Sequence, residues 1–288
     1  MIRVSAYRAN RILFNFIRAN AITGTAILPV NICPSVVETL QYTGMQVRFV
    51  DINLKTLCMD TVAAMEAISE ASLLIYVHTY GVDATPDAFF AELKKRKPGL
   101  YIVDDKCLCI PQLDAAKHEQ SAADMILYSL GPKKFVVMEH GALGFVSDKC
   151  RYEEVDESEF FEPISYTFKE AEISARIEQI REYKTKINAI YRNHIPSICQ
   201  YPKAYQNWRF NIRVDNKTEI MQALSDNGLF ASGHYKPLAE GCPNATDLYE
   251  HVINLFNDTY YTEEQAMQTC QIINQMWMLT TDELTTNN

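Results

Sequence analysis

Short apolar runs alternate with amphipathic stretches along the first half of the chain. The apolar runs predict strands over residues 26–28, 46–50, 73–77, 100–103, 125–128 and 141–146. Between them, apolar residues three and four positions apart predict helices over residues 12–17, 35–42, 61–69 and 86–97. Almost continuous apolar character is typical of strands that are buried on both faces. The pattern therefore predicts an α/β fold in three layers, with a mostly parallel sheet between two layers of helices.

The pattern changes after residue 150. An acidic and aromatic segment over residues 151–161 predicts a surface loop, and residues 169–191 predict one long helix with isoleucines along one side. Beyond it, strands are predicted over residues 210–214 and 229–232, and helices over residues 217–227 and 263–278. This order predicts a large α/β domain over residues 1–165, a connecting helix over 166–194 and a small C-terminal α+β domain over 195–288.

Composition and charge narrow the function classes. The chain is 48% hydrophobic and 22% charged, which is typical of a globular protein. Its formal net charge of −9 disfavours nucleic-acid binding, and no apolar run reaches the roughly 18 residues of a membrane span. The eight cysteines form no CxxC pair, and the first residues lack the apolar segment of a signal peptide. We therefore expect a cytoplasmic protein with no metal site, no membrane partner and no nucleic-acid partner.

Candidate chemistry follows two predicted strands. Asp104 and Asp105 end one strand, and the segment from Ser129 to Lys134 follows the next. Ligands of open α/β sheets bind beyond the carboxyl ends of the strands, so these groups are expected at one edge of the sheet. A lysine facing a carboxylate suits pyridoxal 5′-phosphate (PLP), because the lysine forms a Schiff base with the aldehyde and the carboxylate holds the pyridine nitrogen protonated. The same residues also fit a solvated surface loop, or a divalent ion on the two aspartates that the adjacent Lys106 disfavours.

Several motifs in a fixed order decide between these interpretations. They are Ala26–Pro29 with Phe49–Asp51, Val77–Gly81, Ile102–Asp105, Asp124–Ser129 with Gly131–Lys134, Glu139–Ala142, and Ser232–Leu238. In this order they resemble "VIVPA…VFVDVD", "VHLYG", "VIED", "DAACFSFYPTK", "GEGGA" and "TGVHYPPL" of the DegT/DnrJ/StrS sugar aminotransferases, PLP enzymes of fold type I. The resemblance extends from about residue 5 to residue 275. It implies a fold type I large domain with PLP as the cofactor.

The resemblance also implies roles for individual residues. Lys134 takes the place of the catalytic lysine, five positions after the serine of the same motif, and would form the Schiff base and move the proton. Asp105 would pair with the pyridine nitrogen, and Ser129 would bind the cofactor phosphate. The segment over residues 5–10 takes the place of the family's "SGTAAL" turn, where Arg8 and Ala9 would bind the phosphate at a helix N-terminus.

Four further positions complete the expected site. Cys33 takes the place of the aromatic residue that stacks on the cofactor, and His78 follows a strand at the same edge of the sheet. His234 and Tyr235 are expected to bind substrate. Each histidine also has an ordinary structural interpretation, as a hydrogen-bonded residue of the core.

The sequence departs from the family at several positions. Tyr7 stands at a turn glycine, Cys33 at the stacking aromatic, and Leu108 at a glutamine or histidine. The family's "NYR" motif, which supplies an asparagine to the partner subunit, falls near residues 167–169, where the sequence is Thr-Phe-Lys. The resemblance further indicates a short member that lacks the usual N-terminal segment of about 50 residues, by the usual arithmetic of domain size.

The resulting prediction is a PLP-dependent aminotransferase that acts as a homodimer. It would transfer an amino group from an amino-acid donor to a nucleotide-linked keto-sugar, in polysaccharide biosynthesis. The alternative is a degenerate, non-catalytic member that binds a sugar nucleotide or a protein partner. The sequence does not separate transamination from a related PLP-dependent dehydration.

Overall fold

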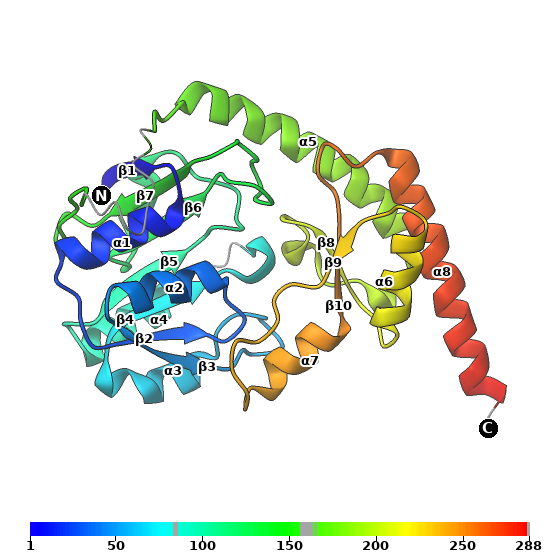
Figure 1. The fold of residues 1–288 in the computed structure, drawn as a ribbon, viewed down its shortest axis with the longest axis horizontal. Helices are drawn as coiled ribbons and strands as arrows, with labels where there is room; N and C mark the ends of the chain where they lie inside the picture. Colours follow the sequence, from blue (N-terminus) through cyan, green and yellow to red (C-terminus); the bar gives the residue numbers. More distant parts are fainter. Residues whose placement is uncertain (83–85, 156–163, 165, 287–288) are drawn as a thin grey trace.

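A seven-stranded sheet forms the larger part of the protein (Figure 1). The structure is a computed structural model that describes residues 1–82, 86–155, 164 and 166–286, with side chains as far as residue 277. The strand order is β1-β7-β6-β5-β4-β2-β3. Strands β2 to β6 pair in parallel, whereas β7 is antiparallel to both β6 and β1. The bounds are β1 Ile2–Ala6, β2 Thr25–Pro29, β3 Gln46–Val50, β4 Ala71–Val77, β5 Tyr101–Asp105, β6 Met125–Ser129 and β7 Ala142–Val146.

Helices cover both faces of this sheet. On one face α1 (Ala9–Ala19) and α2 (Pro34–Tyr42) enclose a core that contains Val103 of β5. On the other face α3 (Thr61–Ala67), α4 (Asp87–Arg96) and the first half of α5 (Glu170–His194) enclose a core that contains Ile102. Successive side chains of a strand point to opposite faces, so these two neighbours belong to different cores. The predicted α/β fold with a mostly parallel sheet is confirmed.

A second, three-stranded sheet has the order β8-β10-β9 and is antiparallel. Its elements are β8 (Phe210–Arg213), β9 (Ala231–Ser232) and β10 (Val252–Leu255), with α6 (Lys217–Asp226), α7 (Pro243–His251) and α8 (Glu263–Thr286). Ile187 and Tyr191 of α5 lie in the core of this part, while Ile173 and Ile177 lie in the core of the large sheet. Helix α5 therefore packs against both parts, and Figure 1 shows it running from one to the other. The predicted division into residues 1–165, 166–194 and 195–288 stays a prediction.

Short 3₁₀ helices complete the chain at Ile68–Glu70, Thr79–Gly81, Ala115–His118, Ser197–Cys199 and Lys203–Tyr205. Three elements were not predicted: β1, α7 and β10. Part of the predicted 151–161 loop, from residue 156 onward, lies outside the described residues. Among the residues described, no helix is both long and apolar enough to cross a membrane.

Candidate functional site

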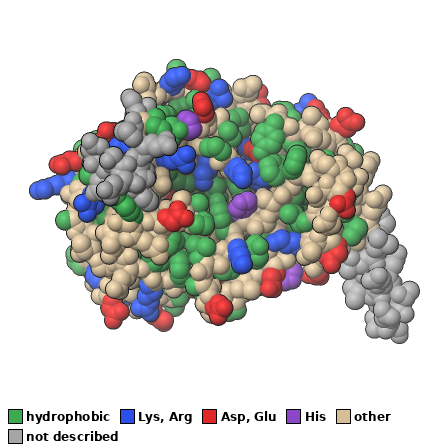
Figure 2. All heavy atoms as spheres, in the orientation of Figure 1, with side chains coloured by type: hydrophobic (Ala, Val, Ile, Leu, Met, Phe, Trp, Pro, Cys, Tyr) green, Lys and Arg blue, Asp and Glu red, His purple; other side chains and the backbone are tan. Residues whose placement is uncertain are grey.

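A cavity of about 270 Å³ lies at the carboxyl ends of β5 and β6, beside the first turn of α1. Figure 2 shows a hollow between the two parts of the molecule, where Lys, Arg and His side chains gather over apolar surface. The cavity is lined by Tyr7, Arg8, Ala9, Asn10, Leu13, Cys33, Ser35, Val36, Asp105, Cys107, Leu127, Ser129, Gly131, Pro132, Lys134, His140 and Gly141. Six of the nine predicted site residues are among them: Arg8, Ala9, Cys33, Asp105, Ser129 and Lys134.

The two aspartates at the end of β5 serve different faces of the sheet. Asp105 lines the cavity on the α1 and α2 side, and its Oδ1 accepts a 2.9 Å hydrogen bond from the backbone N–H of Cys107. The side chain is buried, with 6% exposed, and it forms no ion pair with a described lysine, arginine or histidine. Asp105 is therefore a nearly buried carboxylate that is available to a ligand with a cationic N–H donor.

His78 and Asp104 form a separate buried pair. The Nε2 of His78 lies 2.6 Å from Oδ1 of Asp104, and its Nδ1 lies 2.7 Å from the carbonyl oxygen of Val82. Both side chains are fully buried, and neither is among the residues that line the cavity. The expectation that His78 lies beside the cofactor therefore does not match its position. The physical reason is that Asp104 and Asp105 alternate across the strand, so the partner of Asp104 lies on the opposite face.

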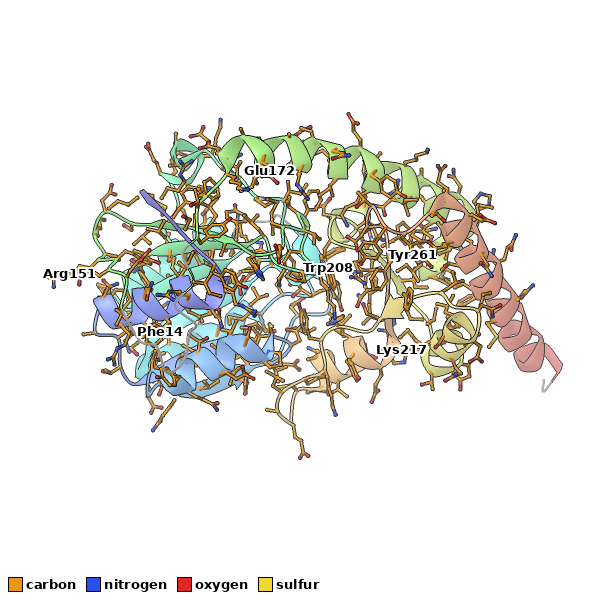
Figure 3. All side chains as sticks on the ribbon, turned by 45° about the horizontal axis from the view of Figure 1, so that its top comes forward. Phe14, Arg151, Glu172, Trp208, Lys217 and Tyr261 are labelled. Atoms are coloured by element: carbon orange, nitrogen blue, oxygen red, sulfur yellow. The ribbon has the colours of Figure 1, made fainter. Side chains whose placement is uncertain are left out.

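The loop that carries Lys134 is tied to the smaller part of the molecule. The indole Nε1 of Trp208 donates a 2.7 Å hydrogen bond to the carbonyl of Lys133, whose φ of 62° is uncommon for a residue with a side chain. Trp208 is almost fully buried and stacks on Tyr80, with ring centroids 6.2 Å apart. Figure 3 shows Trp208 between the two parts of the protein. Trp208 was not predicted from the sequence, and it holds the backbone next to Lys134.

Acidic groups surround the amine of Lys134. Burial alone lowers the pKa of the Lys134 amine, but Tyr235, Cys107, Cys33 and Asp105 act in the opposite direction and raise this pKa above its usual range. Burial also raises the pKa values of the Cys107 thiol and the Tyr235 hydroxyl, the first further assisted by Asp105. At neutral pH the thiol and the hydroxyl are therefore neutral, while Lys134 carries a charge in the ligand-free protein.

The opposite wall of the cavity is suited to an anion. Arg8 is the N-cap residue of α1, and Ala9 and Asn10 form its first turn. No side chain caps this helix, so its first N–H groups are open to a ligand, and a helix N-terminus favours negative charge. The Oδ1 atom of Asn10 is buried and has no hydrogen-bond partner. Ser129 lies across the cavity, where its Oγ is 3.5 Å from the backbone nitrogen of Gly131.

His234 and Tyr235 reach the site from the smaller part. The backbone N–H of His234 donates a 2.8 Å hydrogen bond to Oδ1 of Asn254, and its carbonyl accepts one of 2.6 Å from the hydroxyl of Tyr80. Burial lowers the pKa of His234 to about 4, assisted by the cations Arg209, Lys133 and Lys134. His234 is therefore neutral at pH 7. Neither His234 nor Tyr235 is among the lining residues, but Tyr235 raises the pKa of Lys134, and Lys134 in turn lowers the pKa of His234.

Two further sequence expectations can be placed. Leu108 is buried beside Tyr80 and Trp208 rather than in the cavity lining. A Cβ atom at Gly81, which has a φ of 76°, would lie 2.4 Å from the carbonyl oxygen of Leu108, so the glycine of the 77–81 motif permits this contact. Within the described residues, no group of three or more His, Cys, Asp or Glu side chains could hold a metal ion.

Several solved structures are similar to this protein over almost its whole length. DesI, determined in the presence of its TDP-sugar product, has a TM-score of 0.73 at 15% identity over 100% of this chain and 83% of its own. Spr1654 from Streptococcus pneumoniae, in its PMP form, has a TM-score of 0.78 at 16% identity over 97% of this chain and 88% of its own. The E. coli GDP-4-keto-6-deoxy-D-mannose-3-dehydratase with hydrated PLP has a TM-score of 0.70 at 12% identity over 95% and 87%.

These structural likenesses establish the fold. A search of curated protein sequences gives no match. The sequence profile of one family matches residues 6–156, just over half of the chain, and covers β2 to β7 with the cavity residues from Arg8 to Gly141. The chain therefore belongs to the DegT/DnrJ/EryC1/StrS aminotransferase family.

Proposed function

We propose that the protein is a PLP-dependent aminotransferase that transfers an amino group from an amino-acid donor to a nucleotide-linked keto-sugar. The observation that supports this most directly is that Lys134 and Asp105 line one cavity together with the open N-terminus of α1. Family membership supports the reaction type. The sugar is supported by DesI, whose structure was determined with a TDP-sugar product.

The residues present fit PLP at three points. Asp105 is a nearly buried carboxylate without a cationic partner, as a protonated pyridine nitrogen requires. The open N-terminus of α1, with Arg8 beside it and Ser129 opposite, suits a phosphate. Lys134 supplies the amine that would bind the aldehyde carbon. When bound, PLP supplies an electron sink that stabilises negative charge on the reacting carbon of the substrate.

The protein's own groups then supply orientation and proton transfer. The Nζ atom of Lys134, once neutral, is the base that moves the proton between the reacting carbons. The Trp208 indole fixes the backbone of the preceding residue and so restricts the position of this amine. The carboxylate of Asp105 would accept a hydrogen bond from the ring nitrogen of PLP and so favour its protonated form. His234 and Tyr235 close the site from the smaller part and are assigned to substrate binding.

The cellular location and the oligomeric state are proposed from the cysteines and from the family resemblance. All eight cysteines are free thiols, which fits a reducing cytoplasm. A homodimer is proposed because the resemblance implies a site completed by a partner subunit. A role in polysaccharide biosynthesis follows if the acceptor is a sugar nucleotide.

A titration with donor screening tests the proposal. PLP is added to the full-length protein, its visible absorbance is followed, and L-glutamate, L-glutamine and L-alanine are then added to the complex. A saturable band that one donor bleaches supports an aminotransferase. A band that every donor leaves unchanged points to a different PLP reaction, such as the dehydration for which one structural neighbour is named. Absence of any band at saturating PLP would support the non-catalytic alternative.

A further inference from the structure

Tyr7 and His140 form a hydrogen-bonded pair at the rim of the PLP cavity. The Tyr7 hydroxyl lies 2.7 Å from Nε2 of His140, and the two ring centroids are 3.9 Å apart. Tyr7 directly follows β1, and His140 lies two positions before β7; the two strands pair from Ala6 and Ala142 onward. The N–H of Gly141 also donates a 2.9 Å hydrogen bond to the carbonyl of Tyr7. The backbone of two paired strands therefore fixes the position of both rings.

A second cavity of about 450 Å³ lies on the other side of this pair. Tyr7 and His140 line both cavities, so they separate one from the other. The far wall comes from the start of α5 and the residues before it, including Tyr166, Lys169, Glu172 and Arg176. Glu172, which Figure 3 labels, lies on the half of α5 that covers the large sheet.

The charges of the second cavity are largely balanced. Glu172 lies 3.5 Å from the amine of Lys169 and 3.3 Å from the guanidinium of Arg176. A second carboxylate, that of Glu139, lies 3.6 Å from Nε2 of His140, so two acidic and two basic side chains line the cavity. The remaining lining is uncharged and comes from Tyr7, Met138, His140, Ile164, Tyr166 and Thr167. Such a lining combines apolar ring surface with a few hydrogen-bonding groups, and it suits a hydroxylated, uncharged group better than a strong anion.

The sequence shows that the pair replaces two small residues of the motifs quoted above. Tyr7 lies in the segment over residues 5–10 that takes the place of "SGTAAL", and His140 stands at the first glycine after the glutamate of "GEGGA". The next glycine is kept: Gly141 has a φ of 135°, and a Cβ atom there would lie 2.3 Å from the hydroxyl of Tyr166. With the small residues of these motifs at positions 7 and 140, no ring would lie between the cavities.

We propose that the Tyr7–His140 pair is a specificity-determining wall between the PLP cavity and a substrate subsite against α5. The pair limits the size of compounds that pass from the second cavity to Lys134, and its hydroxyl and imidazole contact the hydroxylated part of the substrate. The substrate role rests on the proposed function. The wall itself does not, because it can be tested in the protein without PLP.

Cys33 offers a built-in probe for the wall, since its thiol lines the PLP cavity. The full-length, PLP-free protein is treated with methyl methanethiosulfonate or with pyrenyl maleimide, and peptide mass spectrometry follows the rate at Cys33. We expect the small reagent to react in the wild type and the large one to react slowly. The double variant Tyr7→Gly, His140→Gly should raise the rate of the large reagent by about tenfold, a change in barrier of about 1.4 kcal/mol. The rate of the small reagent should change little.

Two single variants guard against a folding defect. Tyr7→Phe keeps the ring but removes the bond to His140, and it should give a smaller increase for the large reagent. Tyr260→Phe removes a hydroxyl that donates to Asp258 in the smaller part, away from both cavities, and should leave both rates unchanged. If the ratio of the large-reagent rate to the small-reagent rate were the same in the wild type and in both position-7 variants, the Tyr7–His140 pair would not limit access to the PLP cavity.

The substrate role is tested separately in the PLP-loaded protein. Binding of 2-methylalanine and of 3-amino-3-deoxy-D-glucose is followed through the absorbance of bound PLP. Tyr7→Phe should weaken the sugar by about fivefold, as expected for loss of one hydrogen bond, and leave 2-methylalanine unchanged. An equal effect on both probes would refute the subsite. If the wild-type protein bound no PLP, the proposed function and the substrate subsite would both be refuted. The labelling rates at Cys33 would then test the wall on their own.

Discussion

The indole of Trp208 donates a 2.7 Å hydrogen bond to the carbonyl of Lys133, across 75 residues of sequence. This bond joins the smaller part of the molecule to the loop that carries Lys134. It also holds Lys133 at a positive φ of 62°, a conformation that a residue with a side chain adopts only when its surroundings impose it. The position of the Lys134 amine therefore depends on packing between the two parts.

Trp208→Phe is expected to slow attachment of PLP to Lys134. The variant keeps an aromatic ring against Tyr80 but leaves the carbonyl of Lys133 without its donor, at a cost of about 1–3 kcal/mol. Stopped-flow absorbance after mixing with PLP measures the attachment rate. The matched control is Trp277→Phe, which changes the only other tryptophan and lies on α8. Equal attachment rates in the wild type and Trp208→Phe would show that the bond does not position Lys134.

Asp105→Asn is expected to lower activity, whereas Asp104→Asn is expected to lower stability. Asp105 faces the cavity, so its change should lower amino transfer by about a hundredfold or more, as loss of a key electrostatic partner does, with little loss of stability. Asp104 is bonded to buried His78, so its change should lower the free energy of unfolding by about 1–3 kcal/mol. Urea denaturation and the half-reaction with the best donor separate the two. The same stability loss in both variants would contradict the assignment of opposite faces.

Cys33→Phe is expected to tighten PLP binding. Cys33 lines the cavity at the position where the family's motif has an aromatic ring, and its thiol lies 3.2 Å from the hydroxyl oxygen of Ser35. A ring stacked on the pyridine should add about 0.5–1.5 kcal/mol, or about 2- to 12-fold in affinity. Cys33→Ser serves as the control, since it changes the thiol without adding a ring. Weaker PLP binding in Cys33→Phe than in Cys33→Ser would show that the cavity places no cofactor ring beside residue 33.

The free energy of unfolding is expected to decrease as the pH is lowered, because of His234. The pKa of this histidine is about 4 in the folded protein and about 6.5 in an unfolded chain, so the unfolded state binds more protons between these values. The free energy of unfolding should therefore decrease as pH falls from about 6.5 towards 4. His234→Gln removes this proton uptake, so its stability should fall less over the same window. Parallel curves for the two proteins would mean that His234 is not kept neutral by its surroundings.

The large sheet could be predicted because its strands are apolar on both faces. The first strand was missed because β1 is an edge strand, with exposed residues at Ile2 and Arg3, and it acquires its order only by pairing with β7. Helix α7 and strand β10 follow each other without a break, at His251 and Val252. No turn residue separates them, so no local signal marked either element.

The sequence predicted those candidate site residues that carry a reactive side chain and lie at or just after the end of a strand. Asp105, Ser129 and Lys134 follow neighbouring parallel strands, and the cavity brings them together. His78 also ends a strand, but its side chain points to the opposite face, which depends on the packing of the sheet. Trp208 carried no signal beyond its rarity, because its partner is distant in sequence. Tyr7 was visible as a departure from a motif, whereas its bond to His140 required the structure.

Covalent trapping of PLP tests the central claim most directly. The full-length protein is incubated with PLP, reduced with borohydride and digested, and mass spectrometry locates the added group. The account predicts one adduct on Lys134, which is lost in Lys134→Ala and kept in Lys133→Ala, the exposed neighbouring lysine. An adduct on Lys133 or on scattered surface lysines, or none at saturating PLP, would contradict the assignment of Lys134 as the residue that binds PLP.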